Sequence, residues 1–388
     1  MHYTLHMTTR CNLRCDYCYI QNDKNINAFH ALDMTRETAF ATVDLAGSNP
    51  ETKRAGLIFF GGEPLLLKDL IYDTIAYARN KEKSGGCRYF FKITTNGLLL
   101  DDDFIEYSKM ENIFIAISID GTQAAHDMHR IDCHGNGSYD KVVTSARKLL
   151  AVKPYSPVLM TIRPDTLSRY ADGVKSLFDL GFKYVVPSLD YSSEWKEEQI
   201  PELERQYEQL AELYISKTLN EYKFYFCPFD VKISSHINNK TYCHERCELG
   251  LRQLSVRPDG TLYPCVQFVG DNEFALGNVF TGIDELKRQA LYIRNETEKE
   301  GCDKCVIRAR CNHYCACLNK QATGSIDEIS PMLCAHERIV LPIADRVAET
   351  LYKTSALFVQ KQYNDFYTLA SLVEDRKKFT SNTYAAFP

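Results

Sequence analysis

Three cysteines near the start of the chain have a spacing that suits metal chemistry. Cys11, Cys15 and Cys18 lie in the segment CNLRCDYC, a C-x3-C-x2-C pattern. Three close thiolates can bind three irons of a [4Fe–4S] cluster, whereas a fully protein-bound cluster takes four cysteines, so the fourth iron is left for a ligand from outside the chain. An iron without a protein ligand implies that an outside molecule binds there and reacts. The alternative is a zinc site in which a residue such as His6 supplies the fourth ligand.

A second set of cysteines follows in the last part of the chain. Ten cysteines fall between Cys227 and Cys334, among Gly, Pro and Asn residues with little hydrophobic periodicity. Where thiols stay reduced, such a group is first interpreted as a set of metal ligands. The closely spaced pairs would also suit zinc sites with four thiolate ligands, which is the alternative. The segment therefore predicts a second domain that is organised by metal.

Length and composition exclude several classes of protein. The chain has 388 residues, of which 45% are hydrophobic and 25% charged, and its formal net charge is -5, as in an ordinary globular protein of two or three domains. Without a long run of one sign, neither nucleic acid nor an anionic membrane is favoured as a partner. The first residues lack the regions of a signal peptide, and no stretch approaches the roughly 20 apolar residues of a membrane span. We therefore expect a cytoplasmic protein.

The first cysteines must be positioned by the elements around them. From residue 2 to about residue 187, short β-rich runs alternate with segments of helical period, which is typical of βα units around a parallel sheet. Six such units predict an α/β fold with a partial (β/α)6 TIM-like barrel, whose catalytic face lies at the carboxyl ends of its strands. We expect strands at His2–Thr8, Leu57–Phe60, Arg88–Thr94, Ile113–Ile119, Val158–Ile162 and Lys183–Pro187, and helices at Thr35–Ala46, Leu66–Arg79, Asp102–Lys109, Tyr139–Leu150 and Thr166–Leu180.

Three further motifs stand where predicted strands end. The second strand is followed by Phe60-Gly61-Gly62-Glu63-Pro64, the third ends in Thr94-Thr95-Asn96-Gly97, and the fourth ends in Ser118-Ile119-Asp120-Gly121. Alone, a GG pair or an NG turn is only a turn signal. Together with the three cysteines, and with an aromatic residue before the third, these motifs resemble the radical S-adenosylmethionine (SAM) enzymes over about residues 3–190.

The resemblance implies a cofactor, a reaction and a set of site residues. In this family, an electron from the reduced cluster cleaves SAM to methionine and a 5'-deoxyadenosyl radical, which removes a hydrogen atom from an unactivated C–H bond. The protein supplies position and shielding from water. By this resemblance Cys11, Cys15 and Cys18 bind the cluster, Tyr17 lies near the adenine, Gly61, Gly62 and Glu63 meet the amino group, Asn96 and Ser118 line the ribose, and Arg130 and Arg163 are candidates for the SAM carboxylate.

For the two arginines an alternative stays open. Guanidinium groups pair well with carboxylates, but a solvent-facing salt bridge would explain Arg130 or Arg163 equally well, and Asp120 could serve only the turn that follows its strand. No residue of the sequence stands out as the catalytic acid or base.

The cysteine-rich segment resembles the SPASM domain, an extension of radical SAM enzymes that holds auxiliary iron–sulfur clusters. The resemblance covers about residues 243–334 and rests on the phrase VRPDGTLYPC, which ends at Cys265, and on a later C-x2-C-x5-C pattern. Cys317 is surplus to the family's order and is an alternative ligand to Cys315. The resemblance implies one auxiliary [4Fe–4S] cluster on Cys243, Cys247, Cys265 and Cys315, and another on Cys302, Cys305, Cys311 and Cys334.

Four parts of the chain follow from these patterns. We expect a radical SAM partial barrel at 1–190, a helical bridging region at 191–242, the SPASM domain at 243–335, and a C-terminal helix and tail at 336–388, with the helix over Ile339–Val359. Cys87, Cys133 and Cys227 have no partner pattern, and we expect them to be small buried residues.

The resemblance implies an enzyme but no single substrate. SPASM-bearing relatives mostly modify ribosomally made peptides or proteins, forming thioether or carbon–carbon crosslinks, or oxidising a sulfatase cysteine or serine to formylglycine. Our leading hypothesis is a peptide maturase that crosslinks a cysteine-containing precursor. The alternative is an anaerobic sulfatase-maturing enzyme, although the predicted sixth strand ends in VPSLDY rather than the QFIP-like run associated with that group. A third hypothesis is a noncatalytic iron–sulfur electron-transfer or scaffold protein.

The same resemblance implies partners. A peptide or protein substrate and a flavodoxin- or ferredoxin-like electron donor are expected. Many peptide maturases carry an amino-terminal leader-binding module, and the first cluster ligand here is residue 11. Leader recognition is therefore expected at the barrel rim, in the region near 191–242, or on a separate protein.

The cysteine count gives a prediction about metal content. Anaerobically reconstituted protein should hold about 12 irons per chain, as three [4Fe–4S] clusters, with sulfide to match. Replacing Cys11, Cys15 and Cys18 by Ala should remove about 4 of these irons, because the two sets of cysteines belong to separate domains. Elemental analysis checks both numbers, and zinc in place of iron would contradict the assignment.

Overall fold

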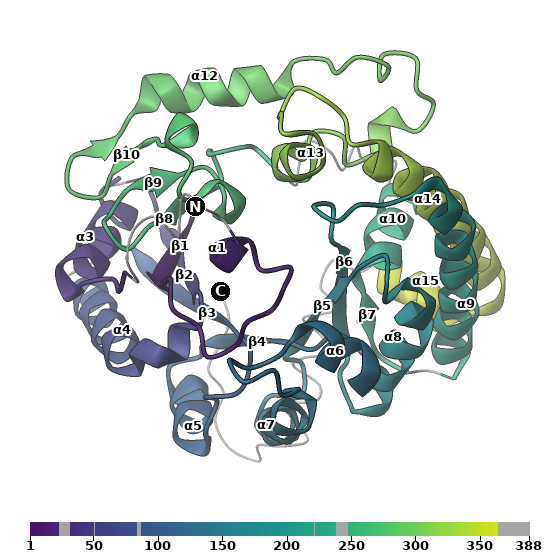
Figure 1. Cartoon of the computed structure of the whole chain (residues 1–388), viewed down its shortest axis with the longest axis horizontal. Coiled ribbons are helices and arrows are strands. Elements are labelled where there is room, and N and C mark those ends of the chain that lie inside the picture. The colour runs from purple at the N-terminus through teal and green to yellow at the C-terminus, as the bar shows by residue number, and fades with distance from the viewer. Residues whose placement is uncertain (23–31, 50, 84–86, 221, 238–246, 364–388) are drawn as a thin grey trace.

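Six parallel strands form the body of the protein (Figure 1). The computed structural model describes residues 1–22, 32–49, 51–83, 87–220, 222–237 and 247–363. The strands lie side by side in the order of the sequence, as expected for a partial barrel of βα units. They are β1 (His2–Thr8), β2 (Arg54–Gly61), β3 (Arg88–Thr95), β4 (Phe114–Ser118), β5 (Pro157–Ile162) and β6 (Tyr184–Leu189).

Helices cover the outer face of this curved sheet. In Figure 1 they lie outside the arc of strands, while the short helix α1 lies inside it. Strand β1 is buried from Tyr3 to Thr8, whereas β3 alternates between exposed and buried residues from Arg88 to Ile93. The helices of this part are α1 (Tyr19–Asn22), α3 (Arg36–Ala46), α4 (Lys68–Lys83), α5 (Asp102–Met110), α6 (Gln123–His129), α7 (Tyr139–Val152) and α8 (Tyr170–Asp179), with short 3-10 helices η1 (Pro64–Leu67) and η2 (Leu167–Arg169).

Side-chain caps fix where several helices begin. The Thr35 side chain accepts a hydrogen bond from the Thr38 N–H at the start of α3, and Asp101 caps α5 in the same way. Thr122 caps α6, a helix that hydrophobic periodicity did not predict because it is short and polar. Helix α6 matters for the site, since two of its residues are buried histidines, His126 and His129.

The sheet continues beyond the six predicted strands at both ends. On one side β7 (Tyr225–Phe226) pairs parallel with β6. On the other side β8 (Gln253–Val256) pairs parallel with β1, and β9 (Leu262–Tyr263) pairs antiparallel with β8. These strands are too short to show a periodic pattern. The cysteine-rich part of the chain therefore shares the sheet of the barrel.

The rest of the chain is mostly helical and irregular. Helix α12 was not predicted because only Leu291 and Asn295 of its residues are buried, so it shows no apolar stripe. In Figure 1, α12 and α13 lie across the side where the arc of strands is open. The elements are η3 (Glu197–Gln199), α9 (Ile200–Leu219), α10 (Cys227–Ile237), η4 (Val266–Phe268), η5 (Asn272–Phe274), β10 (Gly277–Asn278), β11 (Gly282–Ile283), α12 (Glu285–Glu296), η6 (Arg308–Arg310), α13 (Ala316–Thr323), α14 (Pro331–Thr354) and α15 (Ala356–Tyr363).

The C-terminal helix begins earlier than predicted. Helix α14 starts at Pro331 rather than at Ile339, because Ser330 caps it by accepting a hydrogen bond from the Leu333 N–H. It packs against α9 and α10. A buried ion pair between Lys232 of α10 and Glu337 of α14 lies in this contact.

The three cysteines outside the patterns differ in burial. Cys87 is buried as expected and Cys227 is partly buried. Cys133 is exposed, so the expectation of burial is wrong for it. It lies in a surface turn that Asp132 organises by accepting hydrogen bonds from the N–H groups of His134 and Asn136.

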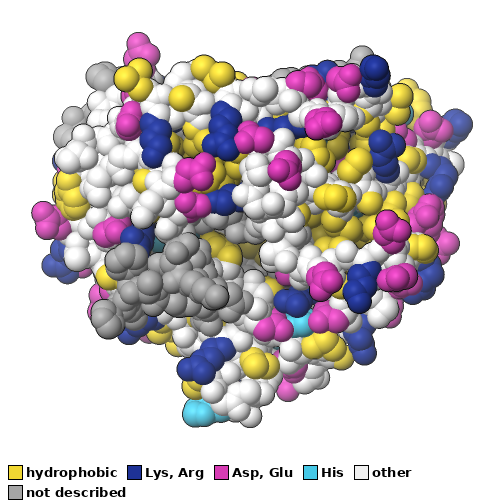
Figure 2. Space-filling view, turned by 45° about the horizontal axis from the view of Figure 1, so that its top comes forward, with side chains coloured by type: hydrophobic (Ala, Val, Ile, Leu, Met, Phe, Trp, Pro, Cys, Tyr) yellow, Lys and Arg dark blue, Asp and Glu magenta, His cyan; other side chains and the backbone are white. Residues whose placement is uncertain are grey.

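The surface agrees with the charge pattern of the sequence. Figure 2 shows acidic and basic side chains interspersed over the face that it presents, without a large area of one sign. Among the described helices, none combines the length and the apolar character needed to cross a lipid bilayer.

A pair of glycines tests how tightly the barrel is packed. Gly121 and Gly135 both have positive φ, 78° and 82°, but a Cβ on Gly121 would lie 2.6 Å from the Gly173 Cα, whereas a Cβ on Gly135 would meet nothing within 4 Å. Because only Gly121→Ala adds overpacking to the shared backbone strain, it should lower the free energy of unfolding by about 1–3 kcal/mol more than Gly135→Ala. Urea denaturation of both variants measures the difference, and equal losses would contradict it.

Candidate active site

The first three cysteines lie on a loop between β1 and α1, at the carboxyl end of the sheet. The Cys18 N–H donates to the Cys15 carbonyl at 3.1 Å, and the Leu13 N–H donates to the Cys11 Sγ at 3.4 Å. The three thiols interact electrostatically with one another. Burial raises the pKa of Cys11 to about 11 and that of Cys15 to about 12, so metal binding here must displace protons.

The zinc alternative takes its fourth ligand, His6, from β1. In the described part of the chain, no three His, Cys, Asp or Glu side chains converge closely enough to hold one metal ion. His6, which the zinc alternative used, is buried on β1 with its ring edge against Phe60. The cysteines of a [4Fe–4S] cluster bind different irons, so they need not converge on one point.

The end of β2 packs directly on the cysteine loop. Gly61 has a φ of 125°, and a Cβ there would lie 2.5 Å from the Thr8 carbonyl oxygen. A Cβ on Gly62 would lie 2.0 Å from the Arg10 carbonyl oxygen. Only glycine permits this approach, so Gly61 and Gly62 set the position of the loop relative to the sheet.

The Glu63 side chain links the ends of β2 and β3. Its carboxylate accepts hydrogen bonds from the Leu65 N–H at 3.0 Å, from the Thr95 hydroxyl at 2.8 Å and from the Asn96 N–H at 2.8 Å. Complete burial raises the pKa of Glu63 to about 7, although these hydrogen bonds act in the opposite direction. The Asn96 amide donates in turn to Asn12 Oδ1 at 2.7 Å and to Cys11 Sγ at 3.5 Å. Asn96 therefore lies against the cysteine loop.

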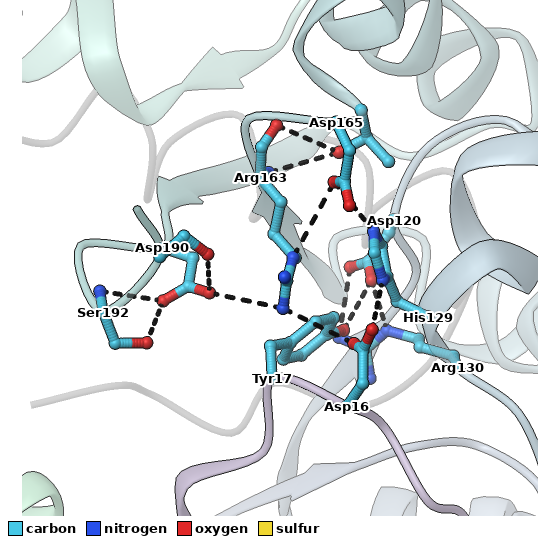
Figure 3. A network of polar contacts seen from close by, with 11 residues as sticks. Asp16, Tyr17, Asp120, His129, Arg130, Arg163, Asp165, Asp190 and Ser192 are labelled. Carbon is cyan, nitrogen blue, oxygen red and sulfur yellow. Dashed lines mark hydrogen bonds and ion pairs between the residues drawn. The ribbon is translucent and has the colours of Figure 1, made fainter. Parts of the chain in front are cut away.

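Asp120, which follows β4, and Arg130, which follows α6, form a buried ion pair that Tyr17 of the cysteine loop joins (Figure 3). Arg130 donates to both Asp120 oxygens at 2.8 and 3.1 Å, and the Tyr17 hydroxyl donates to Asp120 at 2.5 Å. Burial raises the pKa of Asp120, but the Arg130 charge and hydrogen bonds outweigh it and leave the pKa below its ordinary value. Ser118 ends β4 nearby and is partly buried. The Arg130 ion pair is thus buried rather than solvent-facing, and it fixes the Tyr17 ring.

Arg163 occupies the middle of a set of carboxylates. Figure 3 shows its guanidinium between Asp190 on one side and Asp16 on the other. Its nitrogens lie 3.5 Å from Asp16, 3.8 Å from Asp165 and 3.8 Å from Asp190, and its buried Nε donates no hydrogen bond. Guanidinium groups pair well with carboxylates, and the role of Arg163 as a contact of the SAM carboxylate stays a prediction.

A cavity of about 570 Å³ lies beside Arg163. The barrel contributes Asp16, Tyr17, Arg163 and Asp190 to its wall. The cysteine-rich part contributes Gln267, Phe268, Cys317, Lys320 and Gln321. The cavity therefore joins the candidate SAM site to the second set of cysteines.

Four cysteines lie together at this wall, and one of them, Cys317, lines the cavity. The Cys315 and Cys317 Sγ atoms are 3.4 Å apart, and Cys265 is hydrogen-bonded to Cys317. Cys247 interacts electrostatically with Cys265 and Cys315. Cys243, the remaining predicted ligand of this cluster, lies outside the described residues. The contacts do not distinguish Cys315 from Cys317 as ligand.

A separate group contains Cys302, Cys305, Cys311 and Cys334. Cys302 interacts with Cys305 and Cys334. The Arg338 guanidinium lies 3.4 Å from the Cys334 Sγ and 3.9 Å from the Cys305 Sγ, and Cys334, Cys305 and Cys311 all contribute to raising its pKa. This grouping matches the one that the resemblance implies, and the role of these residues as ligands stays a prediction.

Several site residues were missed by the sequence patterns. His129 of α6 contacts Asp16 at 2.9 Å and Asp165 at 3.0 Å, and so links the cysteine loop to the end of β5. Asp190 follows β6 directly. A polar residue at the carboxyl end of each predicted strand was the available signal, but nothing in the spacing pairs these residues.

The buried Asp120–Arg130 pair has a matched surface counterpart. Asp120→Asn leaves the Arg130 charge uncompensated, since their side chains are only 3% and 9% exposed, and it should cost about 3–5 kcal/mol of unfolding free energy. Asp179→Asn breaks an exposed pair with Lys175 and should leave the free energy of unfolding nearly unchanged. Urea denaturation compares the two variants. A loss below 1 kcal/mol for Asp120→Asn, on the scale expected of exposed pairs, would contradict the structural role.

The choice between Cys315 and Cys317 can be tested by substitution. If Cys315 is the ligand, Cys317→Ala should keep nearly the full iron content and activity, whereas Cys315→Ala should lose up to about 4 irons. Iron analysis of both reconstituted variants checks this. A larger loss at Cys317 would reverse the assignment.

Family models match both parts of the chain. Residues 5–168 match the model described as the Radical SAM superfamily, and residues 247–312 match SPASM, described as an iron–sulfur cluster-binding domain. A "Cysteine-type anaerobic sulfatase-maturating enzyme" of Clostridium novyi is 27% identical over 325 residues, which are 80% of this chain and 82% of that protein.

Solved structures share the fold. The structure of anSMEcpe with bound AdoMet has a TM-score of 0.78 at 20% identity, covering 91% of this chain and 100% of that chain. SuiB of Streptococcus suis, bound to its precursor peptide SuiA, has a TM-score of 0.58 at 13% identity, covering 86% of this chain and 75% of that chain. The expectations of a radical SAM barrel, a SPASM domain and an enzyme are confirmed. This chain is a radical SAM superfamily enzyme with a SPASM iron–sulfur cluster-binding domain.

Proposed function

We propose that this enzyme oxidatively crosslinks a cysteine-containing peptide, forming thioether or related bonds. The observation that carries the proposal is the cavity of about 570 Å³, whose wall is shared by Tyr17 and Arg163 on the barrel side and Cys317 on the cysteine-rich side. A substrate held there would lie between the source of the radical and a second iron–sulfur site. A crosslinking reaction needs both, because it removes a hydrogen atom and then one more electron.

The residues of the barrel side are suited to hold SAM in one orientation. When bound, the cluster and SAM together supply the 5'-deoxyadenosyl radical. The chain's own contribution is position: Arg163 offers unused guanidinium donors to a carboxylate, and the buried Asp120–Arg130 pair fixes the Tyr17 ring beside it. Burial of these groups keeps water from competing for their hydrogen bonds.

The cysteine-rich side is suited to accept an electron close to the substrate. Cys247, Cys265 and Cys315 group with Cys317, which reaches the cavity wall. Together with Cys243 this group would hold one auxiliary [4Fe–4S] cluster, and the group around Arg338 would hold a second. With the cluster on Cys11, Cys15 and Cys18 this makes three clusters, reduced by a flavodoxin- or ferredoxin-like donor. In this proposal residues 1–190 are the radical SAM barrel, residues 191–242 are a helical bridging region, residues 243–335 are the SPASM domain, and residues 336–388 are the C-terminal helix and tail.

Similar proteins support a peptide as substrate. One structure of anSMEcpe contains bound AdoMet and the Cp18Cys peptide, and SuiB is bound to the precursor peptide SuiA. The leader of such a precursor would bind at the barrel rim, in the region near 191–242, or through a separate protein.

The sequence at the end of β6 supports the crosslinking proposal. Asp190, Ser192, Ser193 and Glu194 line the cavity directly after β6. The segment VPSLDY at the end of β6 differs from the QFIP-like run that is associated with sulfatase-maturing enzymes. We therefore expect this wall to contact a different substrate side chain.

Formylglycine formation on a sulfatase cysteine is the second candidate. It is supported by similarity to a cysteine-type sulfatase-maturating enzyme over 80% of this chain. Both candidates begin when the 5'-deoxyadenosyl radical removes a hydrogen atom from a C–H bond of the peptide. They differ in which carbon is attacked and in the product.

Mass spectrometry of a reacted peptide tests the proposal. Reconstituted protein is incubated without oxygen with SAM, a strong reductant and a cysteine-containing precursor peptide encoded near its gene. We expect 5'-deoxyadenosine, methionine, and a peptide that has lost two hydrogen atoms per crosslink together with the matching free thiols. The variant with Ala at Cys11, Cys15 and Cys18 is the control and should form none of these products, because it lacks the ligands of the first cluster.

The other outcomes discriminate between the hypotheses. A sulfatase-type peptide that loses its cysteine sulfur and gains an aldehyde would support the second candidate. Turnover of a small molecule, with every peptide left unchanged, would contradict both.

A further inference from the structure

The proposed reaction needs a group that takes a proton from the substrate. Three carboxylates line the cavity, those of Asp16, Asp190 and Glu194. Asp16 is 53% exposed and lies 2.9 Å from the His129 ring, while Glu194 is exposed at the edge. The Asp190 side chain is only 9% exposed. Of these three, Asp190 is therefore the carboxylate held away from solvent.

The backbone and side chain of Asp190 are both fixed. Its N–H donates to the Ile162 carbonyl at 2.9 Å, and its carbonyl accepts from the Trp195 indole at 2.7 Å. Its Oδ1 accepts from the Ser192 N–H at 3.0 Å and from the Ser192 hydroxyl at 2.5 Å. The carboxylate thus has a defined direction before any substrate binds.

One oxygen of Asp190 keeps room for another donor. A carboxylate oxygen can accept about two hydrogen bonds. Oδ1 uses both, whereas Oδ2 accepts from the Ser193 hydroxyl at 2.6 Å and faces the Arg163 Nη1 at 3.8 Å, which is beyond hydrogen-bond reach. The open position of Oδ2 lies on the Arg163 side, where Figure 3 shows the two groups facing each other.

We propose that Asp190 is the catalytic base that accepts the thiol proton of the substrate cysteine. The inference rests on the proposed function. In the balanced reaction, one C–H and one S–H bond break and one C–S bond forms. The hydrogen atom goes to the 5'-deoxyadenosyl carbon, the proton goes to Asp190 Oδ2, and the remaining electron goes to an auxiliary iron–sulfur cluster, which is the one-electron oxidant.

The competing explanation is that Asp190 only orients Arg163. Asp165 provides a matched control, since it also lies 3.8 Å from Arg163 but does not line the cavity. If orientation of Arg163 were the whole role, Asp190→Asn and Asp165→Asn would behave alike. A base would distinguish them, because only Asp190 meets the substrate.

The experiment measures deoxyadenosine and crosslinked peptide separately. For Asp190→Asn, kcat for the crosslinked peptide should fall about 100-fold or more, as on removal of a general base. Deoxyadenosine formation and the KM for SAM should stay within about threefold of wild type. Asp190→Glu should recover part of the crosslinking, because it restores a carboxylate. Asp165→Asn should keep deoxyadenosine and crosslinked product in the same ratio as wild type, because Asp165 does not line the cavity, and any change in the KM for SAM should be of similar size in the two variants.

Several results would overturn the assignment. A raised KM for SAM in Asp190→Asn, with deoxyadenosine and product falling together, would make Asp190 a positioning residue for Arg163. Unchanged crosslinking would give it no role, and loss of iron or of the cooperative unfolding transition in both Asp190 variants would make it structural. If wild type crosslinks no peptide, the proposed function fails and this inference with it, whereas a defect confined to the Asp190 variants concerns the inference alone.

Discussion

The position of the whole site depends on one backbone contact, that between the end of β2 and the cysteine loop. The Gly62 N–H donates to the Thr8 carbonyl at 2.8 Å, and the Glu63 N–H donates to the Arg10 carbonyl at 2.9 Å. No side chain fits between these two backbones. From there the buried Glu63 carboxylate reaches Thr95 and Asn96, so the loop and the ends of β1, β2 and β3 form one rigid unit. A cluster bound by the loop would therefore have a fixed position relative to these strand ends.

A second unit of the site consists of ion pairs and charged hydrogen bonds. Asp120 binds Arg130 and Tyr17, while His129 and Arg163 lie among Asp16, Asp165 and Asp190. The first group is buried and fully paired. The second is looser, with ion-pair distances of 3.5–3.8 Å around Arg163, and it borders the cavity. Rigid pairing on one side and unused hydrogen-bonding capacity on the other are what a site needs to hold a cofactor firmly and still admit a substrate.

Much of the barrel was predictable from the sequence, for a physical reason. Strands that are buried on both faces, such as β1, stand out as β-rich runs, and their carboxyl ends meet at one edge, so motifs at those ends had to lie together. The partners within the site were not predictable. Neither the pairing of Asp120 with Arg130 nor the approach of Asp190 to Arg163 follows from any spacing, because both depend on how α6 and the end of β6 pack. Helix α12 gave no signal because its apolar residues Leu286 and Ile293 face solvent.

The pairing of β8 with β1 has a consequence for how the chain is made. His2 lies opposite Gln253, so one edge of the first strand has no partner until that part of the chain has left the ribosome. At roughly 5–20 residues per second, this takes on the order of ten to fifty seconds. During that time a strand with the sequence HYTLHMT offers an open row of backbone donors and acceptors to other nascent chains. Synthesis of the cysteine-rich part ends this exposure, because β8 then pairs with the open edge of β1.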